Sequence, residues 1–195
     1  INTTNTQMDL GAVTLAADTT LDTGNAAAGV LNVGAVTSGT NALTLDSGST
    51  AGATIGLTSF ADATGGLTIR DAGGLATIGA VGSGTSGDVT ITNSQAGVTF
   101  SSTVDAGTLA ITDTADNQDI TFSGDVTAVT LTTTGNLYDV IFQEDVTVTN
   151  DVTFAAIRNL DIGGGTDDIA TFTGGLDTAA NVTGTVTIAG TINTT

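Results

Sequence analysis

Carboxylates are the side chains of this sequence that could do chemistry. Asp119 and Asp139 each precede a phenylalanine by three residues, and Asp125 and Asp145 each follow one by three. In adjacent layers of a repeating β-fold, such carboxylates would lie about 5 Å apart. Their repulsion at that distance costs about 1 kcal/mol in water and several times more at an effective dielectric constant of about 20. Calcium, which binds oxygen ligands, would relieve it. The alternative is that these aspartates occupy solvated turns and accept local backbone hydrogen bonds.

A second group of carboxylates follows a run of glycines. The segment 163–169, Gly-Gly-Gly-Thr-Asp-Asp-Ile, resembles one copy of the calcium-binding nonapeptide repeat, with Asp167 and Asp168 as the ligands. Thr166 stands where that repeat has glycine, the acidic spacing differs by one residue, and the segment occurs once. Calcium is the one cofactor that the sequence suggests. The predicted metal ligands are Asp119, Asp139, Asp125, Asp145, Asp167 and Asp168.

Catalytic residue types are scarce. His and Cys are absent, and the only cationic side chains are Arg70 and Arg158. General acid–base catalysis favours His, Lys or Cys, and glycoside hydrolysis needs two facing carboxylates. The two arginines fall about four repeats apart, so we expect each to pair with a nearby aspartate. A polysaccharide-cleaving enzyme is therefore the least favoured of three functional hypotheses, and we predict that the chain is not an enzyme.

The net charge of −18 restricts the partners. Nucleic acids and anionic membranes both attract basic surfaces, so we expect the chain to bind neither. No run of 18 apolar residues predicts membrane insertion as a helix. The absence of cysteine excludes disulfides and thiolate metal sites. An acidic chain poor in trypsin sites suits a location outside the cell.

Apolar residues recur with a period of about 22 residues, which indicates internal repeats. Each predicted anchor residue is followed by a second apolar position three or four residues later, such as Val104, Val126 and Val146. An apolar-x-apolar triplet comes next, for example Leu67–Ile69 or Val129–Leu131. The predicted anchors are Leu10, Val33, Ile55, Ile78, Phe100, Phe122, Phe142 and Ile162.

Each repeat therefore contains three short alternating segments separated by turn residues, and period-two alternation is typical of strands with one buried face. This pattern predicts an all-β, right-handed parallel β-helix, with about 8–9 coils of 20–23 residues and three short strands per coil. Residues 1–195 would form a single domain, with Phe100, Phe122 and Phe142 stacked in its interior. A β-sandwich is the alternative fold, but its hairpins do not require a fixed period.

The repeat is less regular after Ile162. The triplet Val186–Ile188 restores the pattern only if one coil spans 26 residues or a loop is inserted. The tetrapeptide Ile-Asn-Thr-Thr occurs at both Ile1 and Ile192. It suggests either one unit of a longer repeat array or end-to-end stacking of subunits, and self-association is thus the predicted partnership.

The composition rich in Gly, Thr, Ala and Asp, with runs such as Ile120-Thr-Phe-Ser-Gly-Asp-Val126, resembles large repetitive bacterial surface proteins. These are the passengers of autotransporters and filamentous adhesins, and some surface-layer proteins. The resemblance implies a β-helix displayed on a bacterial cell surface or secreted, often with calcium. We expect an extracellular structural protein that forms part of a fibre, a surface layer or an adhesin stalk. The alternative is an adhesin that binds a glycan or a host protein, for which Tyr138 and Phe60 are the candidate exposed aromatics.

Overall fold

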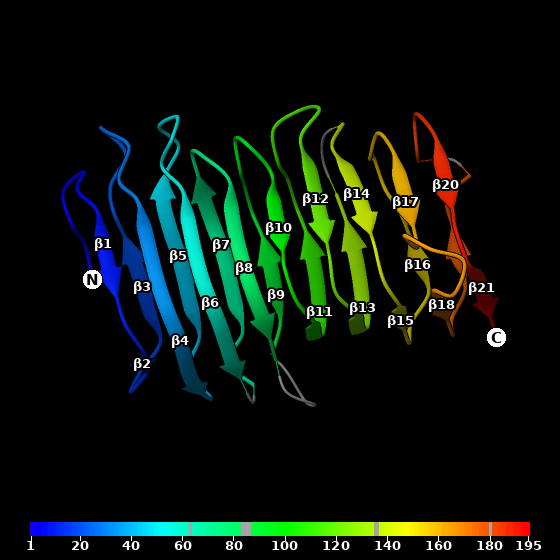
Figure 1. The fold of residues 1–195 in the computed structure, drawn as a ribbon, viewed down its shortest axis with the longest axis horizontal. Coiled ribbons are helices and arrows are strands. Elements are labelled where there is room, and N and C mark those ends of the chain that lie inside the picture. The colour runs from blue at the N-terminus through cyan, green and yellow to red at the C-terminus, as the bar shows by residue number, and fades with distance from the viewer. Residues whose placement is uncertain (63, 83–86, 135–136, 180) are drawn as a thin grey trace.

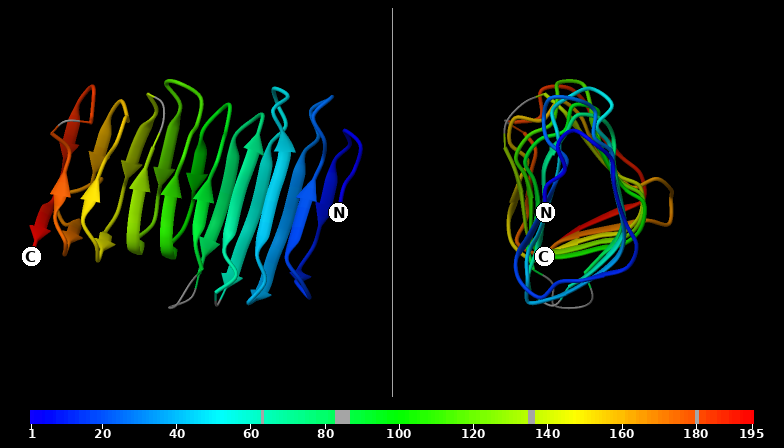
Figure 2. Two further views of the ribbon diagram at one scale, coloured as in Figure 1. Left: turned by 180° about the vertical axis from the view of Figure 1, so that it is seen from behind. Right: turned by 90° about the vertical axis from the view of Figure 1, so that its left-hand side faces the viewer.

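The computed structural model describes residues 1–62, 64–82, 87–134, 137–179 and 181–195. The chain winds about eight times around one axis, and seen along this axis the coils overlay as a rounded triangle (Figures 1 and 2). Every strand pairing is parallel and joins one coil to the next. Within the described ranges the structure contains no helix, and so no helix that could span a membrane. The prediction of an all-β parallel β-helix is confirmed.

The strands form where apolar and hydroxyl residues alternate. In Val98–Phe100, Val98 and Phe100 are buried and Thr99 between them points outward. Successive side chains of a strand point to opposite faces, so each such triplet contributes two side chains to the core. β-Branched residues also favour the pleated backbone. The core is therefore a thin interior column of side chains, built coil by coil.

Three walls line this column. The first wall contains β1 (Met8–Leu10), β4 (Leu31–Gly39), β6 (Ile55–Asp62), β8 (Ala76–Val81), β10 (Val98–Phe100), β12 (Asp119–Phe122), β14 (Asp139–Phe142), β17 (Leu160–Ile162) and β20 (Val186–Ile188). The second contains β2 (Val13–Thr14), the ends of β4, β6 and β8, the starts of β11 (Val104–Ile111) and β13 (Val126–Thr133), then β15 (Val146–Val148), β18 (Ile169–Phe172) and β21 (Thr191–Thr194). The third contains β3 (Thr19–Asp22), β5 (Leu43–Gly48), β7 (Leu67–Ala72), β9 (Val89–Ile91), the ends of β11 and β13, β16 (Val152–Thr153) and β19 (Leu176–Asp177).

The predicted anchors form one file on the first wall, with a single correction. In the third coil, Leu57 pairs with Val33 and belongs to the file, whereas Ile55 pairs with Leu31. Ile55 and Leu57 are both buried, so alternation alone could not distinguish them. The corner between the first and second walls shows that Leu57 is the anchor, because Leu57 stands three residues before the inward Phe60, as Val33 does before Val36.

The predicted aromatic ladder is present inside the first wall. Phe100, Phe122 and Phe142 pair in register on β10, β12 and β14 and are fully buried. Ring centroids of Phe100 and Phe122 lie 4.9 Å apart, and those of Phe122 and Phe142 5.0 Å apart, with interplanar angles of 8° and 13°. The rings thus stack at about the coil spacing.

Tyr138 and Phe60 are both buried, so the expectation that they could form an exposed aromatic patch is wrong. Phe60 belongs to the inward file of the second wall, where it pairs with Val36 and Val81. The Tyr138 hydroxyl donates to the carbonyl oxygens of Thr134 and Ile111, at 2.9 and 3.2 Å. Burial raises the pKa of Tyr138. The hydroxyl group of Tyr138 thus has hydrogen-bond partners inside the fold, and the side chain can be fully buried.

The third-wall triplet Val129–Leu131 is shifted by two residues. Leu109 pairs with Leu131 and Ile111 with Thr133, so Leu131 and Thr133 point inward. Val129 is 52% exposed. Val129 and Leu131 are separated by one residue and both apolar, so the sequence pattern fits either placement, and the ladder to β11 selects one of them.

The long coil predicted after Ile162 is present. Ile162 pairs with Ile188, which is 26 residues further along the chain. Four of the extra residues precede β18, because Ala170 follows Ile162 by eight residues whereas its second-wall partner Val146 follows Phe142 by four. The two Ile-Asn-Thr-Thr tetrapeptides lie on different walls, because Asn2 pairs with Asp22 on the third and Asn193 with Thr171 on the second. They are therefore not equivalent positions of a coil.

The two similar segments Val33–Val36 and Ile78–Val81 form the same corner between the first and second walls. Both have glycine directly after the anchor residue. A Cβ on Gly34 would lie 2.7 Å from the carbonyl oxygen of Gly11, and one on Gly79 would lie 1.8 Å from that of Thr58. Glycine is thus required there for close coil-to-coil approach. Residues 83–85, where the similarity continues, lie outside the described residues.

Candidate functional site

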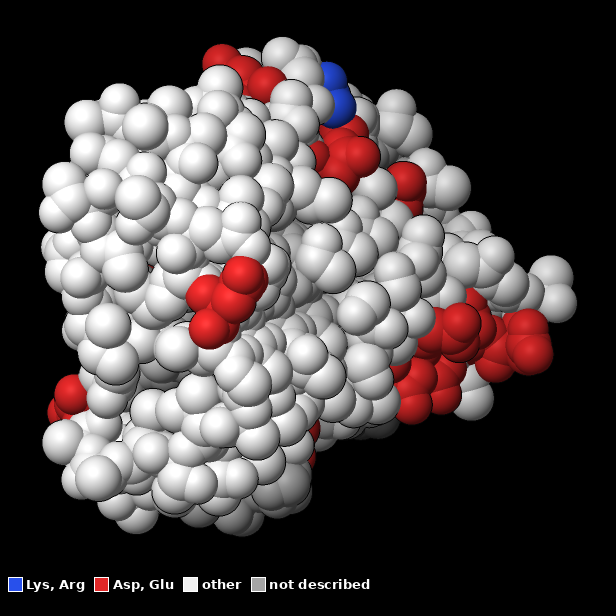
Figure 3. Space-filling view, turned by 60° about the vertical axis from the view of Figure 1, so that its left-hand side comes forward, with Lys and Arg blue, Asp and Glu red and all other residues white. Residues whose placement is uncertain are grey.

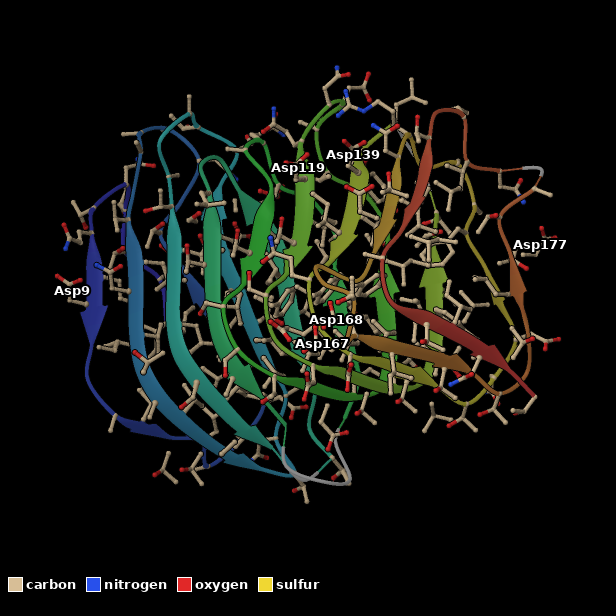
Figure 4. All side chains as sticks on the ribbon, turned by 45° about the vertical axis from the view of Figure 1, so that its right-hand side comes forward. Asp9, Asp119, Asp139, Asp167, Asp168 and Asp177 are labelled. Carbon is tan, nitrogen blue, oxygen red and sulfur yellow. The ribbon has the colours of Figure 1, made fainter. Side chains whose placement is uncertain are left out.

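Asp119 and Asp139 lie side by side at the start of β12 and β14 (Figure 4). Arg158, in the next coil, supplies the cation beside them. Its Nε and Nη2 donate to the two carboxylate oxygens of Asp139 at 2.7 and 2.6 Å. Asn159 donates to the same carboxylate from its backbone and side-chain nitrogens, at 3.1 Å each. Asp139 is therefore held by a bidentate ion pair with Arg158 and by the amide of Asn159. The predicted pairing of an arginine with a nearby aspartate is present here.

Arg158 also reaches one coil further down. Its Nη1 donates to Oδ1 of Asn117, 41 residues away in sequence, so the guanidinium connects three successive coils. Two residues before Arg158, Ala156 has a φ of 56°, a left-handed conformation that is unfavourable for alanine. We define Asn117, Asp119, Asp139, Arg158 and Asn159 as the arginine clamp.

The arginine clamp separates the pKa values of its two aspartates. Burial alone would raise the pKa of Asp139, but the hydrogen bonds from Arg158 and Asn159 outweigh it and hold this pKa below its ordinary value. Burial and, next, the negative charge of Asp139 raise the pKa of Asp119, against the opposing effect of Arg158. The stacked pair thus favours one firmly ionised carboxylate and one that protonates more readily.

We expect Asp139→Asn to lower the melting temperature by about 2–4 °C at pH 7. Because folding lowers the pKa of Asp139, its ionised form stabilises the fold above the ordinary aspartate pKa of about 4. This contribution is lost as the pH falls through the lowered pKa. The difference between variant and wild type should therefore shrink toward pH 2–3, as measured by circular dichroism melts.

Asp119→Asn is the matched control for this prediction. The pKa of Asp119 is raised, so its charge destabilises the fold at neutral pH and its protonation stabilises the fold on acidification. The melting temperature of the control at pH 7 should stay level or rise. Equal losses from both variants would mean that the ion pair of Asp139 is not the stabilising feature.

A second stack of aspartates was missed from the sequence. Asp22 pairs with Asp46 and Asp46 with Asp71, on three successive coils of the third wall. Arg70 occupies an irregularity of this ladder and donates from Nε to Oδ2 of Asp46 at 2.6 Å. Asn2 and Asn93 donate to the outer members, Asp22 and Asp71. The recurring Asp-x-Gly at 22–24, 46–48 and 71–73 was the available signal.

Both arginines of the chain therefore lie beside aspartates that stack across coils. The two ion pairs are Arg70–Asp46 and Arg158–Asp139, each with an N···O distance of 2.6 Å. Figure 3 shows the same arrangement on one face, where basic atoms lie directly beside a group of acidic ones and other acidic groups are separate. At the stack of Asp119 and Asp139, the charge of Asp139 contributes to raising the pKa of Asp119 and the charge of Arg158 opposes this rise, so a cation of the chain itself offsets the repulsion predicted there.

The other four predicted ligands lie in two further places, at the turns before β13 and β15 and on the loop before β18. Asp125 and Asp145 are exposed, and they occupy equivalent places just before Val126 and Val146, which pair in register. Oδ1 of Asp145 accepts the backbone N–H of Ile169 at 2.7 Å. The six predicted residues thus form two register-matched pairs, 119 with 139 and 125 with 145, and a separate loop that carries the last two.

Asp167 and Asp168 lie on the loop between β17 and β18 (Figure 4). Oδ2 of Asp168 accepts the backbone N–H groups of Gly164 and Gly165, at 2.6 and 2.7 Å. Glu144 lines the same surface hollow as this loop. Glu144, Asp167 and Asp168 thus line one hollow, and Asp168 already accepts two backbone hydrogen bonds within its own loop.

No three acidic side chains among the described residues are arranged to hold a metal ion. Calcium binding at the six aspartates stays a prediction. If calcium binds, the melting temperature measured by differential scanning calorimetry should be higher in millimolar calcium than in chelator. The double variant Asp125→Asn/Asp145→Asn should lose this difference. Identical melts with calcium and with chelator would contradict it, and Asp88→Asn on another corner is a suitable control.

No protein-family model matches the chain, and neither a curated protein nor a solved structure was found to be similar to it. The fold agrees with the β-helical surface proteins that the sequence resembles. Each stack of aspartates, with the arginine beside it, is formed by residues of neighbouring coils. Their position on successive coils gives them a structural role in joining the coils.

Proposed function

We propose that the chain is a structural rod in an extracellular assembly: part of a fibre, a surface layer or an adhesin stalk outside a bacterial cell. The observation that carries the proposal is the parallel ladder, which runs from β1 to β20 on the first wall, from β2 to β21 on the second and from β3 to β13 on the third, where the separate pair β16–β19 follows. Its hydrogen bonds point along the long axis. Tension along the rod is therefore shared among many backbone hydrogen bonds at every step.

The interior supports the same role. Each coil places buried apolar side chains directly above those of the coil below, as Phe100, Phe122 and Phe142 do. A coil that peels away would expose its own side chains and those of its neighbour. The arginine clamp adds a polar connection across three coils.

The charge suits a rod that works beside others of its kind. A net charge of −18 keeps neighbouring rods apart at low ionic strength. Divalent cations such as calcium, which bind carboxylates, would instead bridge them. The function we propose is mechanical and does not involve catalysis.

Immunogold electron microscopy with antibodies raised against residues 1–195 tests this proposal on intact producing cells. We expect label on the cell exterior or on extruded fibres. Sectioned cells with label confined to the interior would contradict it. Pre-incubation of the antibody with the purified chain is the specificity control.

A further inference from the structure

The sequence offers trypsin-type proteases two peptide bonds. These enzymes cleave after Lys or Arg, whose cationic side chain enters a pocket that holds a carboxylate. The chain contains no Lys, and its two arginines are Arg70 and Arg158. The bonds that such an enzyme could cleave are therefore Arg70–Asp71 and Arg158–Asn159.

The two bonds lie in different local structures. Arg70 belongs to β7, which pairs with β5 on one side and with β9 on the other. Arg158 lies in the irregular segment between β16 and β17, at the corner that leads from the third wall to the first. Ala156, two residues earlier, is exposed. Because proteases cut preferentially at exposed segments outside strands, the Arg158–Asn159 bond is the more vulnerable of the two by its position.

The arginine clamp occupies the side chain that the protease would have to bind. The guanidinium of Arg158 makes a bidentate ion pair with Asp139 and donates a further hydrogen bond to Asn117. Asp139 thus competes with the carboxylate of the protease pocket, because both bind the same guanidinium. The Arg158 side chain is 32% exposed, so it reaches the surface but is already bound there.

The peptide group that would be cleaved is engaged as well. The carbonyl oxygen of Arg158 accepts the N–H of Gly184 at 2.8 Å, and the N–H of Asn159 donates to Asp139 at 3.1 Å. The N–H of Arg158 donates to the carbonyl oxygen of Tyr138 at 2.8 Å. An extended peptide is recognised through its backbone hydrogen-bonding groups. Those of Arg158 and Asn159 become available to a protease only when the corner opens.

We propose that the arginine clamp protects the Arg158–Asn159 bond from trypsin-type proteases. The bond can be cut only from an open state in which this corner has left the rod, and the rate of cutting follows the population of that state. Asp139 keeps the population low, because opening breaks its bidentate ion pair with Arg158. The protection is separate from any mechanical role of the rod.

Limited trypsin digestion of the folded chain at neutral pH tests the proposal, with the fragments 1–158 and 159–195 identified by mass spectrometry. Asp139→Asn should be cut at Arg158 about 10-fold faster than the wild type, as expected for the loss of a charged hydrogen-bonded partner. Asn117→Gly is the second variant. It removes one acceptor of Arg158, and glycine tolerates the φ of 63° at this position. This variant should give a smaller increase at the same bond.

Two controls separate the loss of the clamp from a general loss of stability. Asp88→Asn removes a carboxylate that accepts the backbone N–H of Thr108 at another corner, and it should leave the rate at Arg158 unchanged. In Asp139→Asn itself, cleavage at Arg70 should rise much less than cleavage at Arg158. The same holds for digestion by thermolysin, which cuts beside apolar residues throughout the chain. Circular dichroism must show each digested variant folded.

Equal rates of cleavage at Arg158 in the wild type and in both clamp variants would overturn the proposal. Increases of equal size at Arg158 and at Arg70 in Asp139→Asn would overturn it too, because they would indicate that the whole rod is destabilised.

Discussion

Phe122→Ala is expected to lower the free energy of unfolding by about 3–5 kcal/mol. Phe122 is fully buried and is the middle ring of the aromatic ladder, with Phe100 at 4.9 Å and Phe142 at 5.0 Å. Truncation removes both ring contacts and leaves a cavity between layers whose spacing is fixed by the backbone ladder. Urea denaturation followed by circular dichroism measures the loss.

Val129→Ala is the control on the neighbouring strand, because Val129 is 52% exposed. It should change the free energy of unfolding by no more than about 0.5 kcal/mol. Phe122→Leu, which keeps most of the volume, should fall between the two variants. A loss below about 1 kcal/mol for Phe122→Ala would show that the ladder is not a tightly packed core.

Gly79→Ala is expected to cost about 1–3 kcal/mol, a large effect for one added methyl group. The new Cβ would lie 1.8 Å from the carbonyl oxygen of Thr58. That oxygen belongs to the backbone of the preceding coil, so the clash can be relieved only by separating two coils at their corner. Thermal melts and urea denaturation should both show the loss.

Gly11→Ala is the matched control. Gly11 follows Leu10 as Gly79 follows Ile78, but no atom lies within 4 Å of the Cβ that alanine would add. This variant should be neutral or stabilise the fold by up to about 1 kcal/mol, because alanine restricts the unfolded chain. Similar losses at both positions would point to a cause other than coil-to-coil contact.

Much of this fold could be predicted because a β-helix repeats its own contacts. The file through Phe100, Phe122 and Phe142 follows from period and residue type alone, since equivalent positions must lie above one another. The errors arise where two inward candidates stand two residues apart. Ile55 and Leu57 are one such case, and only the corner geometry and the ladder resolve it.

The aromatic residues outside the triplets show a second limit. Phe60 stands in a file otherwise made of aliphatic residues, and Tyr138 directly precedes β14. Sequence pattern offers no reason to bury either one. The structure provides it through the second-wall register for Phe60 and two carbonyl acceptors for the hydroxyl of Tyr138.

The aspartate sites were predicted in part for the same reason. The alignment of Asp119 with Asp139 followed from the phenylalanine period, and the pairing of each arginine with an aspartate was also expected. The identity of the partner depends on where an irregular turn places a long side chain. No spacing rule connects Arg158 with Asn117, 41 residues earlier. The third-wall stack through Asp46 was missed because its coils have no phenylalanine at the corresponding place.

The in-register pairing of Phe100 with Phe122 has a consequence for rods of other sizes. Duplication of residues 101–122 would insert one complete coil and leave every flanking side chain on its original wall. The rod would lengthen by a single strand spacing of about 4.8 Å. The length of the rod can therefore be changed in steps of one coil, and the packing of its interior stays the same.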